Sequence, residues 1–310
     1  MANKIIFMGT PLFCVPILKS LHQNGYNIAA VYTQPPQKSH RGQKINKSPI
    51  QIVSETFNIE CRTPKTLKDN NEEYKLIKKL DADLAIVCAY GIIIPKNFLN
   101  LVKKGFVNIH ASILPKWRGA APIQRSIMNL DLETGISIMK INEELDSGPV
   151  SNKYKIKISP IQNAGEISEI LSTLAAEKIL DNVNDILTDK AKFINQDHSK
   201  ATYAKKIRKE ESQIDWNDEA LKIIGKINGL SPSPGVFFSF NGERYKILKA
   251  VIGSGSGQVG EVISNQLEIA CKGNKSIKIL EIQRQGKKSQ KISEFILGSK
   301  IKKGLNLLNV

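Results

Sequence analysis

Short apolar segments alternate with amphipathic, helix-like segments over residues 1–189 of this 310-residue chain. The segments that we expect to form strands include residues 4–8, 26–33, 84–88 and 106–110, and 84–88 is apolar throughout. Strands that alternate with helices build a mostly parallel sheet. Because ligands bind at the carboxyl ends of the strands in open α/β sheets, we expect the functional site at that edge.

Two polar residues occupy the carboxyl half of the otherwise apolar segment 106–110. Since side chains alternate along a strand, Asn108 and His110 point to the same face of the sheet. An amide and an imidazole side by side can stabilise an oxyanion that forms on a carbonyl group under attack. The pair alone also fits polar residues that end a strand, so it indicates a site only together with its surroundings.

Further segments are expected at the same edge. Tyr90 and Gly91 follow the strand 84–88, and a segment rich in proline and glycine, 112–122, follows His110. Asp146 lies in an acidic, turn-rich segment, and a carboxylate beside an imidazole favours the charged ring and orients it. On its own, an Asp-Ser-Gly sequence is more typical of a plain turn.

Several classes of protein are disfavoured by the sequence. The four cysteines lie far apart and have neither metal-site nor redox spacing, which is typical of reduced thiols in a cytosolic protein. The turn at residues 9–11 lacks the glycines of a dinucleotide-binding fingerprint, which argues against a dehydrogenase. We recognise neither a signal peptide nor an apolar segment long enough to span a membrane, so we expect a cytoplasmic protein.

The net charge of +16 is distributed unevenly: it is +5 over residues 1–189 and +11 over residues 190–310. A basic excess in the smaller part suggests a polyanionic partner, and nucleic acid rather than a membrane because no amphipathic anchor is evident. A lysine-rich composition of the whole genome would give a similar excess, so charge alone does not decide.

The segment 34–47 is a polar loop with four basic residues and no acidic one. It is longer than most connections in α/β folds, which favours a functional loop over the alternative of a solvated insertion. A helix is predicted to follow, with Ser48 as its N-cap, Pro49 at its first position and Gln51 completing a capping box.

The composition changes after residue 189, and we predict a linker over residues 190–208 and a second domain over 209–310. The second domain is predicted to begin with a helix over 216–228 and to end with one over 290–297. Between them we expect short strands at 235–240, 243–251, 260–263, 267–271 and 276–283. The Asn-Gly sequence at 241–242 is a strong hairpin signal, and short, evenly spaced strands indicate a small barrel.

The run NIHASILPKWRGAAPIQR at residues 108–125, followed by LDSG at 145–148, resembles the 10-formyltetrahydrofolate-dependent formyltransferases. Shorter matches are spread over essentially the whole chain, and the similarity is strongest to members that formylate methionyl-tRNA. Departures from the family pattern are Ile113, Ser147 and Pro149. The resemblance implies an α/β fold, with a Rossmann-like formyltransferase domain over 1–189 and an OB-like β-barrel at the C-terminus.

The resemblance also implies a reaction and its site. The formyl group of 10-formyltetrahydrofolate would pass to the α-amino group of initiator methionyl-tRNA, with Asn108, His110 and Asp146 as catalytic residues and without a metal. The residues implied in the folate pocket are Tyr90, Gly91, Ser112, Ile113, Leu114, Pro115 and Asn142. The residues implied in tRNA binding are Lys38, Arg41, Lys44, Lys205, Lys206 and Arg208. We expect a monomer because no coiled-coil pattern is evident.

Three alternatives stay open at this stage. Family members that act on glycinamide ribonucleotide share the Asn, His and Asp set, but the basic C-terminal domain is unexpected there. Members that formylate sugar nucleotides also carry a C-terminal extension, although the basic linker and the match at 214–216 count against them. A non-catalytic RNA-binding protein on the same scaffold is disfavoured because the three catalytic residues are intact.

Overall fold

A computed structural model describes residues 3–39 and 44–308 of the chain. These residues form two compact units. Unit 1 comprises Met1–Gly119, Gly135–Ile156 and Ser168–Tyr203, and unit 2 comprises Ala120–Thr134, Lys157–Ile167 and Ala204–Val310. Two stretches from the first 189 residues therefore belong to unit 2, whereas the domains predicted from the sequence are contiguous.

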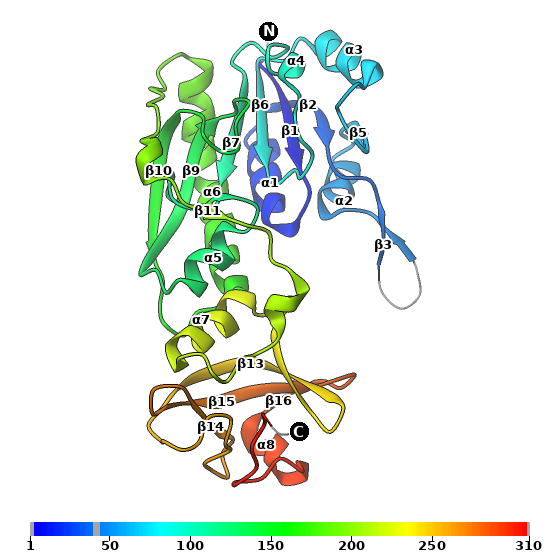
Figure 1. The fold of residues 1–310 in the computed structure, drawn as a ribbon. Helices are drawn as coiled ribbons and strands as arrows, with labels where there is room; N and C mark the ends of the chain where they lie inside the picture. The colour runs from blue at the N-terminus through cyan, green and yellow to red at the C-terminus, as the bar shows by residue number, and fades with distance from the viewer. Residues whose placement is uncertain (1–2, 40–43, 309–310) are drawn as a thin grey trace. The chain divides into compact units, whose positions relative to one another are not determined.

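Unit 1 is built on a seven-stranded sheet with the strand order β10-β9-β7-β6-β1-β2-β5 (Figure 1). The strands are β1 (Lys4–Gly9), β2 (Asn27–Tyr32), β5 (Cys61–Arg62), β6 (Leu84–Cys88), β7 (Phe106–His110), β9 (Glu133–Lys140) and β10 (Val150–Lys157). The pairs β1–β2, β1–β6, β2–β5 and β6–β7 are parallel, and β7–β9 is antiparallel. The prediction of a mostly parallel sheet is confirmed.

The interior strands of this sheet are apolar because helices cover both faces of a parallel sheet. All five residues of β6 are buried, and residues 5–9 of β1 are buried as well. The side chains of Ile6, Ala85 and Phe106 share one core cluster with Ile77 of helix α3 (Asn71–Leu80) and Phe98 of helix α4 (Lys96–Leu99). The strand order therefore places β7, which carries the polar pair, beside the most hydrophobic strand of the unit.

The helices of unit 1 lie between consecutive strands of the sheet along the chain, except α6, which follows β10. They are α1 (Val15–Gln23), α2 (Pro49–Thr56), α3 (Asn71–Leu80), α4 (Lys96–Leu99) and most of α6 (Ala164–Leu187), with 3-10 turns at Leu12–Cys14 and His198–Lys200. Helix α3 starts where the side chain of Asn70 accepts a hydrogen bond from Glu73 N, and it ends at Asp81 in the left-handed conformation. Helices α1 and α6 are in contact, since Ser20 Oγ donates to the carbonyl oxygen of Ala176 at 2.7 Å.

The predicted cap of α2 is confirmed in one half and wrong in the other. Ser48 Oγ accepts a hydrogen bond from Gln51 N at 3.0 Å, as an N-cap should. The Gln51 side chain does not return to Ser48: its Oε1, which would accept from Ser48 N, has no hydrogen-bond partner among the described residues, and its Nε2 donates to Glu55 Oε1 at 3.1 Å. Before this helix, the predicted loop contains two short paired strands, β3 (Gln37–Ser39) and β4 (Lys44–Asn46), which project from unit 1 in Figure 1.

Unit 2 contains an antiparallel sheet of order β12-β13-β15-β14, with β16 paired to β15. Its strands are β12 (Val236–Phe240), β13 (Glu243–Gly253), β14 (Glu268–Cys271), β15 (Lys275–Arg284) and β16 (Ser289–Lys291). Its helices are α5 (Pro122–Met128), α7 (Ala220–Leu230) and α8 (Ile292–Gly298), with a 3-10 turn at Lys209–Ser212. Two-residue strands lie at β8 (Arg118–Gly119) and β11 (Tyr203–Ala204), where the chain passes between units.

The hairpin between β12 and β13 turns at Asn241 and Gly242, which both have positive φ, as the Asn-Gly sequence predicts. Two other predictions for this unit need correction. Helix α7 begins at Ala220 rather than 216, because Asp215 Oδ1 accepts from Asn217 N and forms a turn. The predicted strand 260–263 makes only isolated bridges, one of them between Val262 and Ile269.

Among the residues that the structure describes, none of the helices has the length and apolarity needed to cross a membrane.

Candidate active site

Asn108 and His110 lie side by side on one face of β7, at its carboxyl end. Asn108 is level with Val87 of β6 and with Met139 of β9. The side chain of His110 is 6% exposed, whereas Asn108 is half-buried. Within the described part of the chain, the Asn108 amide forms no hydrogen bond. This half-buried amide is therefore available to bind a ligand.

Asp146 joins this pair from a loop far along the chain. Its Oδ2 lies 3.6 Å from His110 Nδ1, and the same oxygen accepts a hydrogen bond from Gly119 N at 2.8 Å. The Asp146 side chain is 16% exposed, so the carboxylate lies in a partly desolvated position. The structure thus brings together Asn108, His110 and Asp146, which the sequence analysis selected.

The orientation of the His110 ring is determined by the neighbouring loop. Its Nε2 lies 2.9 Å from the carbonyl oxygen of Trp117. A carbonyl oxygen can only accept, so Nε2 carries the proton of this hydrogen bond. Nδ1 is therefore the ring nitrogen that faces the Asp146 carboxylate.

The loop 112–119 is held by hydrogen bonds from several directions. Ser137 Oγ on β9 accepts from Leu114 N at 3.0 Å and donates to the Ser112 carbonyl oxygen at 2.7 Å. Trp117 N donates to Thr202 Oγ1 at 2.9 Å. Thr202 lies in the segment that we predicted as a linker, and nothing in its polar, non-periodic sequence signals this contact.

The four residues 112–115 of the predicted folate pocket differ in exposure. Ser112 and Leu114 are fully buried, and Ser112 Oγ donates to the Lys116 carbonyl oxygen at 2.6 Å. Ile113 and Pro115 are partly exposed. The buried pair fixes the loop, while the other two present apolar surface.

Tyr90 and Gly91 follow β6 at the same edge of the sheet as His110, as predicted. The Tyr90 carbonyl oxygen accepts from Thr10 Oγ1 at 2.9 Å and from Gln34 Nε2 at 3.2 Å, so the segments after β1, β2 and β6 meet here. The Tyr90 side chain is 2% exposed, and burial raises the pKa of its hydroxyl above the ordinary value. Tyr90 can therefore offer a ligand its backbone but not its ring.

Asn142 lies at the start of the Asp146 loop. Its side chain is hydrogen-bonded to Ser147 Oγ, at 2.9 Å from Nδ2 and 3.0 Å from Oδ1. Ser147, one of the departures from the family pattern, is buried and thus stabilises the loop beside Asp146.

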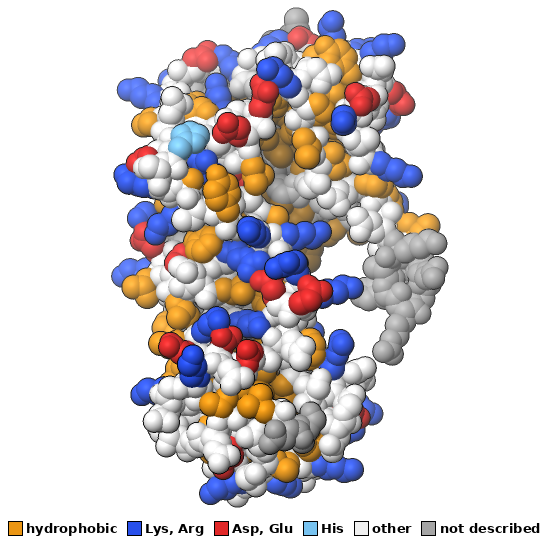
Figure 2. Space-filling model, viewed as in Figure 1, with side chains coloured by type: hydrophobic (Ala, Val, Ile, Leu, Met, Phe, Trp, Pro, Cys, Tyr) orange, Lys and Arg blue, Asp and Glu red, His pale blue; other side chains and the backbone are white. Residues whose placement is uncertain are grey.

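The basic residues predicted to contact tRNA lie on the surface where the structure describes them. Lys205, Lys206 and Arg208 are exposed. Arg41 lies outside the described residues, as do the side chains of Lys38 and Lys44. On the face drawn in Figure 2, lysine and arginine side chains occur over both units and are interspersed with acidic ones.

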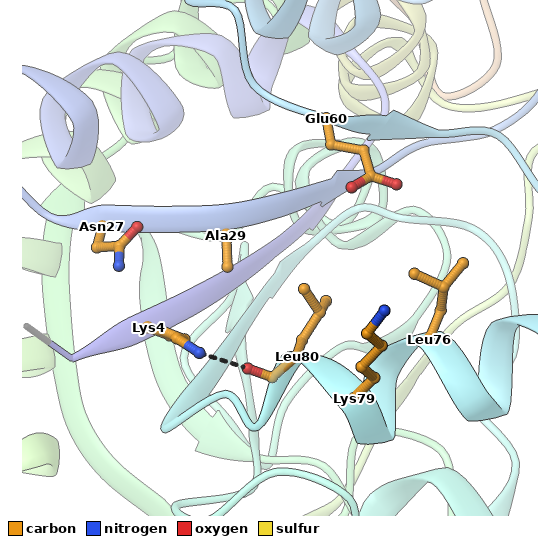
Figure 3. A pocket seen from close by; sticks show the side chains of 7 residues that line it. All are labelled: Lys4, Asn27, Ala29, Glu60, Leu76, Lys79 and Leu80. Carbon is orange, nitrogen blue, oxygen red and sulfur yellow. Dashed lines mark hydrogen bonds between the residues drawn. The ribbon is translucent and has the colours of Figure 1, made fainter.

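A pocket of about 340 Å³ lies elsewhere in unit 1 (Figure 3). It is lined by Lys4 and Asn27 at the amino ends of β1 and β2, with Lys79 and Leu80 of α3 opposite. Its lining lacks the polar pair of β7, so we do not assign the reaction to it. In the described part of the chain, no group of three or more His, Cys, Asp or Glu side chains could hold a metal ion.

Comparison with known proteins identifies relatives over the whole length. Sequence models described as "Formyl transferase" and "Formyl transferase, C-terminal domain" match residues 3–183 and 206–300. A methionyl-tRNA formyltransferase of Pelagibacter ubique is 67% identical over the full length of both chains. Another, from a Chelativorans species, is 40% identical over 99% of this chain and all of its own.

Solved structures share the fold. The sugar 3N-formyl transferase WlaRD, crystallised with dTDP and 5-N-formyl-THF, superposes with a TM-score of 0.70 over 93% of this chain and 100% of its own. The two sequences are 19% identical, so this likeness concerns the fold alone.

Proposed function

The chain belongs to the formyl transferase family, and from that premise we propose that it transfers the formyl group of 10-formyltetrahydrofolate to the α-amino group of initiator methionyl-tRNA. The observation that carries the proposal is the convergence of three side chains at one edge of the sheet. They are the amide of Asn108, the imidazole of His110 and the carboxylate of Asp146, whose Oδ2 lies 3.6 Å from His110 Nδ1.

The folate supplies a formyl group that is already activated for attack by an amine. When the amine attacks the formyl carbon, negative charge develops on the formyl oxygen. The Asn108 amide and the Nδ1–H of His110 donate hydrogen bonds to that oxygen, in a site where hydrogen bonds are stronger than in water. As the new N–C bond forms and the bond to the folate nitrogen breaks, the amine loses one proton and the folate nitrogen takes up one, so that the transfer is balanced in protons.

Asp146 has two roles in this proposal. Its carboxylate lies 3.6 Å from Nδ1 of His110, orients the ring and stabilises the positive charge of the ring that donates Nδ1–H to the oxyanion. It also accepts, through a water molecule, the proton that the amine loses on attack. The fixed position of Oδ2 on the Gly119 amide supports both roles.

The folate pocket is proposed at the segments that surround this site. Ile113 and Pro115 provide apolar contacts for a flat ring, since they are the partly exposed members of the loop 112–115. Tyr90 and Gly91 provide backbone groups, and Asn142 borders the pocket from the Asp146 loop. Residues 1–189 then form the catalytic domain and 209–310 the tRNA-binding domain, joined by 190–208.

The tRNA contacts are proposed at two basic segments, Lys38 to Lys44 in the β3–β4 region and Lys205 to Arg208. Lysine and arginine side chains bind phosphates without reading sequence, so this part of the affinity should fall as salt is raised. We also propose that the protein acts in the cytoplasm as a monomer.

The test is formyl transfer from 10-formyltetrahydrofolate to methionyl-tRNA, with uncharged tRNA and an amino-sugar nucleotide as alternative acceptors. We expect transfer to methionyl-tRNA alone and its loss in His110→Ala. His198→Ala, at an exposed position in unit 1, is the matched control and should retain activity. Transfer to the amino sugar alone would instead identify a sugar-nucleotide formyltransferase, and tRNA binding without transfer would identify a non-catalytic RNA-binding protein.

A further inference from the structure

The side chain of Gln196 is buried against the loop that carries Asp146. It is 8% exposed, and its Nε2 lies 2.9 Å from the carbonyl oxygen of Asp146 and 2.7 Å from that of Gly148. A primary amide has two N–H donors, and both are used here. Gln196 thus binds the backbone on either side of Ser147.

The other end of the same amide is bound by Arg118. Gln196 Oε1 accepts from Arg118 Nε at 3.1 Å and from Nη2 at 2.8 Å, and the arginine is 2% exposed. A guanidinium can only donate and a backbone carbonyl can only accept, so the amide has one possible orientation. All its donor and acceptor positions are then used.

Other hydrogen bonds to the Asp146 loop come from the Asn142–Ser147 side-chain pair within it and from Gly119 N to the Asp146 carboxylate, and neither of them binds the backbone carbonyl groups of Asp146 and Gly148. Residues 142–145 are exposed, and the backbone of Asp146 has a φ of 46°, in the left-handed region that non-glycine residues rarely adopt. Gly148 lies so close to the Lys140 carbonyl oxygen that a Cβ would be 1.9 Å from it. The bonds from Gln196 therefore act on the part of the loop where the backbone conformation is most specific.

Arg118 and Gly119 bind Asp146 at its two ends. Gly119 N binds the carboxylate directly, and Arg118 reaches the backbone of the same residue through Gln196. We propose that Gln196, oriented by Arg118, is a positioning residue that fixes the Asp146 carboxylate beside His110. This proposal rests on the function proposed above, because it assigns Asp146 a part in catalysis.

The variant Gln196→Glu tests the proposal with the smallest change of shape. A carboxylate can still accept from Arg118, but it faces the two carbonyl oxygens with an acceptor instead of a donor. Displacing a reacting group by about 1 Å costs on the order of 100-fold in rate. We therefore expect kcat to fall by about 10- to 100-fold while KM for both substrates changes by less than about threefold.

A second readout does not depend on activity. Hydrogen exchange measured by mass spectrometry should become faster in the peptide covering 142–149 and stay unchanged in the strands of the unit 1 sheet. The matched control is Gln283→Glu in β15, where the amide also donates to a backbone carbonyl, that of Lys287 at 2.9 Å. This control should alter neither exchange at 142–149 nor kcat.

The outcomes separate the two proposals. Unchanged exchange at 142–149 in Gln196→Glu would overturn the positioning role, and so would faster exchange with unchanged kcat. If the wild-type protein transfers no formyl group, the proposed function and the catalytic part of this inference are both overturned. Hydrogen exchange at 142–149 would still test whether Gln196 fixes the Asp146 loop. If Gln196→Glu does not fold, Gln196→Asn, which is shorter by one methylene, is measured in the same way.

Discussion

Replacing Glu211 with glutamine is expected to lower both the free energy of unfolding of unit 2 and the affinity for tRNA. Arg125 binds the Glu211 carboxylate through Nη1 at 2.6 Å and Nη2 at 3.0 Å, and the two side chains are 18% and 22% exposed. The same guanidinium donates from Nε to the Lys205 carbonyl oxygen at 3.0 Å and from Nη2 to that of Lys206 at 3.4 Å. The ion pair therefore orients the backbone beneath two residues that we propose to contact tRNA.

The magnitude follows from the exposure of the pair. Exposed ion pairs contribute roughly 0–1 kcal/mol, whereas breaking a fully buried pair costs roughly 3–5 kcal/mol. At about one fifth exposure, we expect Glu211→Gln to lower the free energy of unfolding by about 1.5–3 kcal/mol. KM for methionyl-tRNA should rise several-fold with kcat nearly unchanged, since the catalytic residues are not touched.

The pH dependence has a definite sign. Hydrogen bonding to Arg125 holds the pKa of Glu211 below its usual value. The pair therefore stabilises the folded protein above the unfolded-state pKa of about 4.3, and this contribution is lost as the pH falls through the lower folded-state pKa. The difference between wild type and Glu211→Gln should be constant at neutral pH and shrink below about pH 4.

Urea denaturation measures the effect, with Trp216 in the unit 2 core as the fluorescent probe. The matched control is Glu243→Gln, which breaks another doubly hydrogen-bonded Arg–Glu pair, at 2.6 and 2.7 Å, whose side chains are 41–48% exposed. We expect no measurable loss of stability in this control. Equal effects of the two substitutions, or a fall in kcat without a change in KM, would refute the reasoning.

Four further substitutions test helix packing, a helix cap and a buried hydrogen bond. Gly229→Ala in α7 should lower the free energy of unfolding, because the added Cβ would lie 2.8 Å from a backbone oxygen of α5 and overpacking costs roughly 1–3 kcal/mol. This cost should exceed the gain of about 1 kcal/mol that alanine gives over glycine in a helix. Gly298→Ala in α8, which has open space around it, is the control and should be neutral or stabilising in the same urea titration. Ser48→Ala removes the N-cap of α2 and should cost about 1 kcal/mol, measured by thermal unfolding. Tyr32→Phe removes a hydroxyl that donates to buried Glu73 at 2.9 Å and should cost about 1.5–3 kcal/mol, and a loss below 0.5 kcal/mol, roughly the effect of an ordinary surface substitution, would contradict this.

Much of the fold was predictable because it depends on local patterns. The apolar run 84–88 defines β6 at its observed bounds, and the Asn-Gly pair at 241–242 defines the hairpin turn. The predicted strand 260–263 was wrong because its backbone hydrogen bonds are divided between two segments, such as Ile263 N to the Glu268 carbonyl oxygen and Val262 N to that of Leu305, so that no continuous ladder forms with either. Sequence alternation does not distinguish such a segment from a regular strand.

Some residues of the candidate site could be predicted from the sequence, and others could not. Asn108 and His110 share a strand, so their common face follows from the period of two. The approach of Asp146 followed from the family resemblance and not from any local rule. Gln196 was missed because it lies 50 residues further along the chain, in a polar segment whose composition is that of a linker.

The hydrogen bonds that Trp117 and Gly119 make to the site have a consequence for mutational scanning. His110 is bound by the carbonyl oxygen of Trp117 and Asp146 by the amide of Gly119, and every substitution except proline at position 119 keeps these two groups. A substitution at either position therefore affects these two groups only by changing the backbone conformation, in which φ is 62° at Trp117 and 117° at Gly119. A substitution library read by growth would attribute any loss at these positions to side chains, whereas an amide-to-ester replacement made by chemical synthesis would remove the Gly119 donor itself.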